Sequence, residues 1–290
     1  MKNIKKLFGG IELTWKKLII FALISAVYTA LMAIIPVVRN SSFDTITTTL
    51  EVWIFIGIFI IMNSKSNKDS ALKCFIFFLI SQPLIYLLQV PFSWRGWEIF
   101  QYYKYWFIWT IICLPLGYIG YYIKKGKWWG YLILLPMIIL TAASYNTYLS
   151  YFSFCYPRYI LICIFCVVAM IIYPNVLFED KRIKIIGTII SCLIVVIITI
   201  PIVLNPHRYS TELLSNVDDK DITKDYQVSL KDEKYGDVYI EYVESIDSYM
   251  IFGDFKKSGT TELIVKTPDG KLKEYDLYID INSYTLEEKQ

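Results

Sequence analysis

The stretch IIGTIISCLIVVIITIPIVL, residues 185–204, decides how this chain folds. It carries no charged side chain. As a helix rising 1.5 Å per residue, it would extend about 30 Å, the thickness of the hydrocarbon core of a bilayer. From Asn205 onward the chain becomes polar, and its apolar residues alternate with polar ones. The stretch therefore predicts a transmembrane helix that ends where a water-soluble region begins.

Six further apolar stretches of comparable length precede this one, and lysines lie beside most of them. Apolar residues make up 56% of the 290 residues and charged residues only 19%, which is too apolar for a soluble protein. The sequence predicts an α-helical integral membrane protein of about seven transmembrane helices, with the lipid bilayer as a partner. The predicted spans cover residues 18–38, 43–63, 71–90, 106–123, 128–145, 159–178 and 185–204.

The second predicted span is the weakest, because its uninterrupted apolar run covers only residues 52–62. To cross a membrane it must include the more polar residues 43–51. The threonines at 47–49, together with Ser81 and Pro83 of the next span, predict a kink around that level. A tilted, shortened or re-entrant helix is the alternative to a full crossing.

Lysine and arginine divide unevenly between the two sets of connecting segments. Short loops rich in these residues stay in the cytoplasm. With a cytoplasmic N-terminus, the inner segments hold fourteen of them and the short outer loops hold four. The pattern predicts a multi-pass plasma-membrane protein whose C-terminal region is extracytoplasmic, and the Lys-, Ile- and Asn-rich composition is typical of bacteria.

The net charge of +3 conceals two halves of opposite sign. Residues 1–204 hold 18 Lys and Arg against 7 Asp and Glu, a net of +11, whereas residues 205–290 hold 11 against 19, a net of −8. Nucleic acids require clustered Lys and Arg on the binding surface. An acidic region outside a basic membrane region therefore predicts no nucleic-acid partner.

The C-terminal region has the short alternating stretches of β-strands. Two such runs flank residues 267–271, whose Pro, Asp and Gly favour a tight turn, so a hairpin is predicted there. Further strands are predicted at 226–230, 238–243 and 249–252. The sequence thus predicts a small all-β, immunoglobulin-like sandwich over residues 223–290, after a linker at 205–222.

The hairpin and the final strand resemble the closing strands of immunoglobulin-like or cadherin-like bacterial surface modules over residues 260–281. The resemblance implies an antiparallel sandwich and carries over no functional residue. Domains of this kind commonly bind proteins through strand edges and loops, so residues 223–290 are expected to contact an extracytoplasmic or membrane protein partner. The region lacks a D-x-D-x-D-G calcium loop, and no metal site is predicted.

Glu51 is the first candidate for chemistry, because an ionisable residue inside a predicted span usually has a function or an ion-pair partner. At helical rise, Glu51 lies about 18 Å and Gln82 about 16 Å above the inner ends of their spans. The two are predicted to meet near the midplane, with Ser81 beside them, and could bind a cation or relay protons. Alternatively, the helix begins at Glu51 and leaves its carboxylate among the outer headgroups, where the helix dipole favours it.

An aromatic outer segment is the second candidate, because ten of the eighteen residues from 92 to 109 are aromatic. Arg95 and Glu98 are three apart and are predicted to pair on one face of a short interfacial helix that also presents Trp94 and Trp97. A lipid-linked or sugar substrate could stack there. Anchoring at the membrane interface explains the same residues without a ligand.

A C-x-x-C pair, Cys163 and Cys166, lies in the sixth predicted span, with Cys155 in the adjoining outer loop. Such thiols could perform membrane redox chemistry, or they could simply pack as small apolar residues between helices. His207 is the single histidine and is expected to be a solvated linker residue. No catalytic residue set, metal site or cofactor is predicted.

Three classes of function stay open. The sequence favours a non-enzymatic bacterial envelope protein, an accessory, sensing or assembly subunit whose β domain contacts a partner. The second class is a small-solute or ion-coupled transporter that uses Glu51 and Gln82. The third is a membrane enzyme, either a thiol oxidoreductase using the cysteines or a lipid-modifying enzyme acting at the aromatic outer segment.

Overall fold

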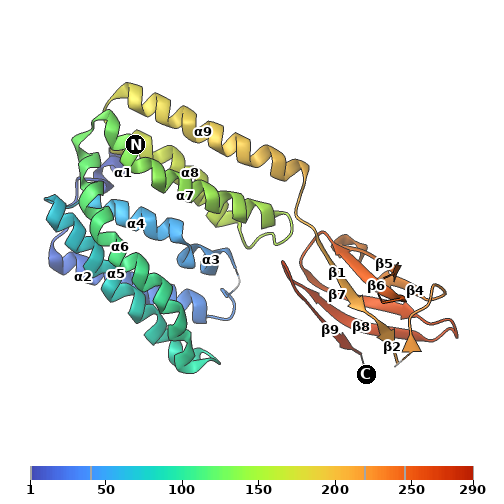
Figure 1. Cartoon of the computed structure of the whole chain (residues 1–290). Coiled ribbons are helices and arrows are strands. Elements are labelled where there is room, and N and C mark those ends of the chain that lie inside the picture. The colour runs from blue at the N-terminus through green and yellow to red at the C-terminus, as the bar shows by residue number, and fades with distance from the viewer. Residues whose placement is uncertain (1, 40, 219, 245, 290) are drawn as a thin grey trace. The chain divides into compact units, whose positions relative to one another are not determined.

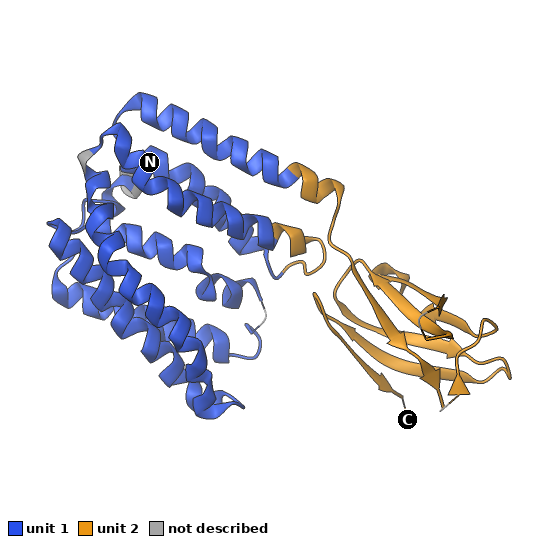
Figure 2. Ribbon diagram, in the orientation of Figure 1, with its two compact units in different colours: residues 1–148, 158–199 blue, residues 149–157, 200–290 orange. Residues whose placement is uncertain are grey.

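The computed structural model describes residues 2–39, 41–218, 220–244 and 246–289. The chain divides into two compact units, coloured separately in Figure 2. The first, the helical unit, contains Met1–Tyr148 and Arg158–Thr199, and the second, the β unit, contains Leu149–Pro157 and Ile200–Gln290. The β unit therefore includes a short segment that precedes the last two helices in the sequence.

The helical part of the chain consists of long helices joined by short connections (Figure 1). Three 3₁₀ segments, η1 (Val90–Phe92), η2 (Gly96–Tyr102) and η3 (Tyr121–Lys125), flank α6 on both sides. The α-helices are α1 (Lys2–Leu7), α2 (Trp15–Ile34), α3 (Ser42–Thr48), α4 (Leu50–Met62), α5 (Asn67–Gln89), α6 (Tyr103–Gly120), α7 (Trp128–Phe152), α8 (Ile160–Leu177) and α9 (Lys181–Leu204).

Six helices in the described residues are long and apolar enough to cross a membrane. They agree with six of the seven predicted spans. The remaining predicted span, residues 43–63, corresponds to α3 and α4, whose axes are bent by 54° at Thr49. Only together are these two helices long and apolar enough to cross a membrane. The helical unit is thus consistent with a membrane protein of six or seven spans.

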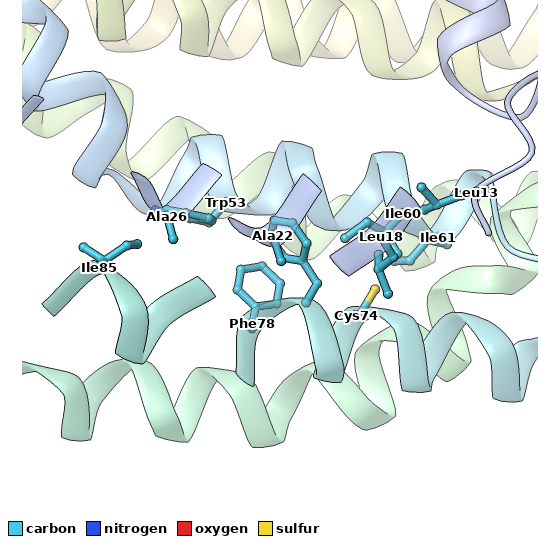
Figure 3. Packing of buried hydrophobic residues seen from close by; sticks show 11 residues of the cluster. Leu13, Leu18, Ala22, Ala26, Trp53, Ile60, Ile61, Cys74, Phe78 and Ile85 are labelled. Carbon is cyan, nitrogen blue, oxygen red and sulfur yellow. The ribbon is translucent and has the colours of Figure 1, made fainter. Parts of the chain in front are cut away.

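Helix α4 lies at the centre of the helical unit (Figure 1). On one side it packs with α2 and α5 in an apolar cluster that includes Leu18, Ile60 and Phe77 (Figure 3). On the other side Phe55 contacts α8, with its ring 5.6 Å from Phe165. Small residues of α2, such as Ala22, are fully buried in the cluster and allow the helices to approach closely.

Helices α5 and α6 meet at Gly117. A Cβ atom at this position would lie 2.9 Å from the Cα atom of Ala71, so only glycine permits the approach. The Ser70 hydroxyl donates a hydrogen bond to the Gly117 carbonyl at 2.8 Å across the same contact. Backbone proximity and a buried hydrogen bond thus fix α5 against α6.

Apart from the ends of α7 and α9, the β unit consists of antiparallel strands. A three-stranded sheet has the order β1-β6-β5, a four-stranded sheet has the order β4-β7-β8-β9, and β2 pairs with β3. The predicted hairpin at 267–271 joins β7 to β8. The strands are β1 (Tyr209–Leu214), β2 (Asn216–Val217), β3 (Lys220–Asp221), β4 (Gln227–Leu230), β5 (Gly236–Val243), β6 (Ser248–Phe255), β7 (Gly259–Lys266), β8 (Leu272–Ile279) and β9 (Tyr284–Glu288).

The predicted linker at residues 205–222 is wrong over most of its length. Strand β1 pairs with β6 from Tyr209 opposite Phe255, and Leu213 is buried. Val217 and Ile222, farther along, are also buried. Strand β1 completes the three-stranded sheet, so the first strand begins at Tyr209, before the predicted boundary at 223.

The segment Leu149–Pro157, which connects α7 to α8, packs against the strands of the β unit. Ser258 donates to the carbonyl of Phe154 from both its backbone nitrogen, at 2.8 Å, and its hydroxyl, at 2.9 Å. The Phe154 side chain is fully buried. The β unit therefore needs residues from two distant parts of the sequence.

Candidate functional site

Glu51 is placed by the break between α3 and α4. The threonine hydroxyls end α3 by donating to carbonyls three residues back, Thr47 to Asp44 at 2.9 Å and Thr49 to Ile46 at 3.2 Å. Thr49 is extended and precedes the first turn of α4, which contains Glu51. The helix thus begins close to Glu51, as the alternative prediction stated, but the Glu51 side chain is only 1% exposed.

Titratable groups on α7 and α8 lie within range of the charge on Glu51. Glu51 interacts electrostatically with Tyr148 on α7 and with Cys166 and Tyr173 on α8. Its Oε2 atom is buried without a hydrogen-bond partner in the described part of the chain, and the same is true of the Tyr173 hydroxyl. We refer to Glu51, Tyr148, Cys163, Cys166 and Tyr173 as the Glu51 cluster.

Gln82 and Ser81 are buried in α5 but do not pair with Glu51. Gln82 Nε2 and Glu51 Oε2 both lack partners among the described residues, whereas a bond between them would have satisfied both. Glu51 does not face α5 because Trp53 does. The two residues are two positions apart in α4, about 200° around the helix, and therefore point to nearly opposite sides. The Trp53 indole, 5.9 Å from the Phe78 ring, occupies the side that faces α5.

The two cysteines of the predicted redox pair belong to the Glu51 cluster. Cys163 and Cys166 are one helical turn apart on α8, buried and free of disulfides. Cys155, the proposed third thiol, is buried and belongs to the β unit. Among the residues that the structure describes, no three His, Cys, Asp or Glu side chains are arranged to hold a metal ion.

A cluster of this composition can exchange a proton. An uncompensated carboxylate away from water is unfavourable, and a proton on Glu51 Oε2 would remove the charge and create a donor. The hydroxyls of Tyr148 and Tyr173 are the polar groups within range of the charge on this carboxylate, although Glu51 Oε2 and the Tyr173 hydroxyl form no hydrogen bond with each other among the described residues. Glu51 also lies in the first turn of α4, a position where the helix dipole attracts negative charge.

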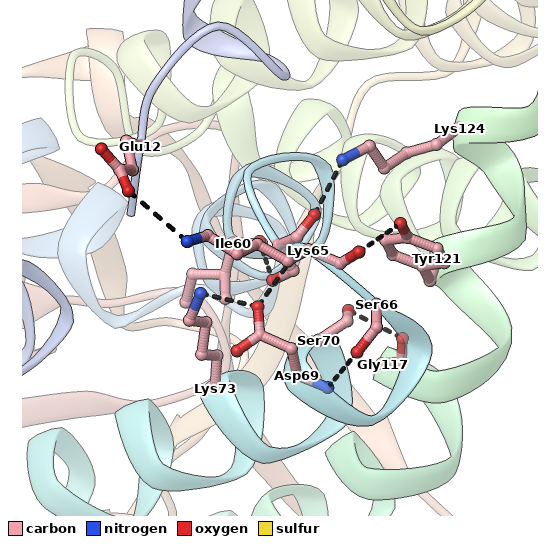
Figure 4. A network of polar contacts seen from close by, with 11 residues as sticks. Glu12, Ile60, Lys65, Ser66, Asp69, Ser70, Lys73, Gly117, Tyr121 and Lys124 are labelled. Carbon is pink, nitrogen blue, oxygen red and sulfur yellow. Dashed lines mark hydrogen bonds and ion pairs between the residues drawn. The ribbon is translucent and has the colours of Figure 1, made fainter. Parts of the chain in front are cut away.

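A second polar network joins the start of α5 to its neighbours (Figure 4). Lys73 is 3% exposed and forms a 2.7 Å ion pair with Asp69, one turn earlier. Asp69 also accepts the backbone N–H of Lys65 at 2.8 Å. Lys124 and Tyr121 donate to the backbone carbonyls of Ser64 and Lys65, each at 2.8 Å. These contacts explain the architecture of this end of the unit without a ligand.

The aromatic outer segment begins at the end of η1, continues through the 3₁₀ helix η2, which contains Glu98 and Trp97, and ends in the first turns of α6. Arg95 lies 4.8 Å from the Trp94 ring and donates to the Tyr102 hydroxyl. The described ion pairs do not join Arg95 to Glu98, because the tyrosine and tryptophan hold the guanidinium instead. Trp97 is exposed and stacks on Phe100 with ring centroids 5.7 Å apart.

His207 is an ordered part of the β unit rather than a solvated linker residue. Its ring lies 4.9 Å from Tyr151 and 5.2 Å from Phe154, with edge-on geometry in both cases. The Nε2 atom is 3.2 Å from the carbonyl oxygen of Ile281. His207 therefore connects the α7–α8 segment to the end of β8.

Comparisons with protein-family models, with curated proteins and with solved structures found no match to this chain.

Proposed function

We propose that the chain is an integral membrane protein that moves a small solute in exchange for, or together with, a proton bound at Glu51. The observation that carries this proposal is the buried Glu51 carboxylate with its unpartnered Oε2 atom at a broken helix. Broken helices place charged or polar groups at membrane depth in many transporters, where they form substrate and ion sites. A proton suits the Glu51 cluster better than a metal ion, because no metal-binding set is present among the described residues.

The proposed topology is that of the sequence analysis. The N-terminus lies in the cytoplasm of a bacterial cell, the helical unit spans the plasma membrane, and the β unit, an immunoglobulin-like sandwich, is extracytoplasmic. The excess of Lys and Arg in the inner segments supports this orientation. If the pair α3 and α4 is one span, the total is seven, and the two ends lie on opposite sides.

The first test asks whether Glu51 carries a proton in an apolar site. Dicyclohexylcarbodiimide, an apolar reagent for protonated carboxyl groups, is added to the full-length protein in native membranes, and modified peptides are identified by mass spectrometry. We expect labelling at Glu51, faster at low pH, and none by a water-soluble carbodiimide. Glu12, whose side chain is 67% exposed, is the internal control and should react only with the water-soluble reagent.

The second test measures proton movement. Protein in vesicles containing a pH-sensitive dye is given a K⁺ diffusion potential in the presence of a small-metabolite extract. Protons should enter faster with wild-type protein than without protein. The variant Glu51→Gln should abolish this difference, and Glu12→Gln should retain it. Equal proton entry with wild type and Glu51→Gln would refute the proposal.

A second candidate function is partner binding by the β unit, favoured by the outer face of sheet β1-β6-β5. Tyr239 and Phe252 stack on this face with ring centroids 5.9 Å apart. Strand register places four carboxylates around them, which makes the face suitable for a basic protein segment. The carboxylates are those of Glu212, Asp237, Glu241 and Asp254.

Affinity purification in mild detergent tests this second candidate. Tyr239→Ala should lose a partner that copurifies stoichiometrically with the wild type. Tyr278→Ala, which removes a comparably exposed tyrosine from β8 in the other sheet, should retain that partner. A partner that is retained by both variants would show that the Tyr239 face does not bind it.

A further inference from the structure

A cavity outside the Glu51 cluster is formed by the ends of α2 and α5 and the start of α3. It has a volume of about 190 Å³. Since a water molecule occupies about 30 Å³ of liquid, the cavity can hold a group of several non-hydrogen atoms. Its polar lining comes from Arg39, Asp44, Gln89 and Ser93, and its aromatic lining from Phe92 and Trp94.

The polar lining combines one cation with one anion. Arg39 offers a planar set of donors that suits a phosphate group. Asp44 has contacts within the chain, and a carboxylate has enough lone pairs to accept further hydrogen bonds. Gln89 and Ser93 can donate or accept. The set matches a ligand that carries both a phosphate and a primary ammonium group.

The rim of the cavity is apolar and highly exposed. Phe92 is 70% exposed and Trp94 is 82% exposed, and Arg95 lies over the Trp94 ring. Aromatic residues of this kind are enriched where a membrane protein meets the headgroup region. An exposed aromatic rim beside a charged cavity suits a ligand whose polar end enters the cavity and whose chains remain in the bilayer.

We propose that this cavity binds the headgroup of an aminophospholipid of the phosphatidylethanolamine type, with its phosphate at Arg39 and its ammonium at Asp44. The inference rests on the proposed insertion of the helical unit in a membrane. It is independent of proton exchange at Glu51, because no residue is shared between the cavity lining and the Glu51 cluster.

Native mass spectrometry of the full-length protein tests the proposal. The protein is placed in mild detergent with equal amounts of phosphatidylethanolamine, phosphatidylcholine and phosphatidylglycerol that have the same acyl chains. We expect one retained phosphatidylethanolamine, favoured over phosphatidylcholine by about tenfold, the equivalent of one hydrogen bond to a charged group. The choline headgroup cannot provide this bond, because its nitrogen is fully methylated.

Three variants distinguish the roles of the lining residues. Arg39→Gln should remove the retained lipid, and Asp44→Asn should reduce the preference for ethanolamine over choline. Lys104→Gln, at an exposed lysine of α6 outside the cavity, should change neither. Arg39 is exposed, so its replacement is not expected to unfold the protein. Unchanged lipid retention by Arg39→Gln would overturn the proposal.

A competition experiment distinguishes a phospholipid ligand from a soluble ligand that carries the same phosphate and ammonium groups. Phosphorylethanolamine, the headgroup without acyl chains, should fail to displace the lipid at matched concentration if the chains contribute to binding. Equal displacement by phosphorylethanolamine, or by inorganic phosphate, would identify a soluble phosphate ligand and overturn the lipid assignment. Neither result depends on proton movement, so the two proposals fail separately.

Discussion

The charged side chains of this protein range from exposed to almost fully buried, so their substitutions should differ in how strongly they destabilise the fold. Asp69 and Lys73 form an ion pair whose lysine is 3% exposed, whereas Glu12 and Lys65 are 67% and 75% exposed and 3.5 Å apart. Removing one member of a buried pair leaves a buried charge unpaired, which is far more destabilising than losing an exposed pair.

We therefore expect Asp69→Ala to lower the free energy of unfolding by about 3–5 kcal/mol and Glu12→Ala by less than about 1 kcal/mol. Thermal unfolding of the full-length variants in mild detergent measures the difference. Similar midpoints for Asp69→Ala and Glu12→Ala would show that Lys73 finds another partner or reaches water.

Glu262 on β7 should make the β unit sensitive to acid. Hydrogen bonds from Lys231 and Lys289, both at 2.8 Å in their ion pairs, lower the pKa of its carboxyl. A carboxyl whose folded-state pKa is lowered stabilises the fold above its unfolded pKa of about 4.3 and loses that contribution as the pH falls through the folded-state value. Protection of β7 amides from hydrogen exchange should therefore decrease below about pH 4.

The variant Glu262→Gln should reduce this pH dependence, because it has no carboxyl to titrate. Glu241→Gln, at an exposed carboxylate outside the described ion pairs, is the matched control and should leave the pH dependence unchanged. An identical pH profile for wild type and Glu262→Gln would contradict the role assigned to Glu262.

Among single residues, Glu51 could be identified from the sequence as a buried carboxylate, but the predicted pairing with Gln82 is not found. Depth along a helix can be counted from the sequence, and it placed Glu51 and Gln82 at one level. The direction of each side chain depends on how the helices pack, and Trp53 turns the other side of α4 toward α5. Tyr148 and Tyr173 were missed because the chain has 24 tyrosines and nothing in the sequence distinguishes these two.

Among the elements, α5 and α6 provide the sharpest prediction. Gly117→Ala would place a methyl group 2.9 Å from the Ala71 backbone, whereas a methyl group added at Gly57 of α4 would have no neighbouring atom of the described residues within 4 Å. We expect Gly117→Ala to destabilise the protein by about 1–3 kcal/mol through overpacking. Gly57→Ala should be neutral or stabilise by up to about 1 kcal/mol, because alanine favours helix. Thermal unfolding in detergent again provides the measurement, and equal midpoints would contradict a tight α5–α6 contact.

The elements that the sequence predicted well have a strong periodic or compositional signal. Long uncharged runs predicted six helices, and the turn at 267–271 predicted the β7–β8 hairpin. Ser81, Pro83 and the threonines at 47–49 predicted a kink near one level; the structure has a break at Thr49, and α5 runs through Pro83 as one helix. Strand β1 was missed because its polar residues resemble a linker, although Tyr209, Thr211 and Leu213 alternate in the manner of a strand.

For the molecule as a whole, the packing of the α7–α8 segment could not be predicted from the sequence, because its contacts join residues about 50 to 105 positions apart. His207→Ala would remove two ring contacts and the interaction with Ile281, so residues 149–157 should become more accessible to proteases. Arg208→Ala, which removes an exposed ion pair with Asp254, should leave cleavage of that segment unchanged. Equal cleavage rates in the two variants would argue against the proposed attachment.

The two hydrogen bonds from Ser258 to the Phe154 carbonyl also set an order of events during synthesis. Phe154 leaves the ribosome about a hundred residues before its partner, and α8 and α9 are made in between. The β unit consequently cannot complete its core until both helices have been produced. A fragment that begins at residue 205 would lack a buried aromatic side chain, so recombinant production of the β unit should include residues 149–157 as a fused or added peptide.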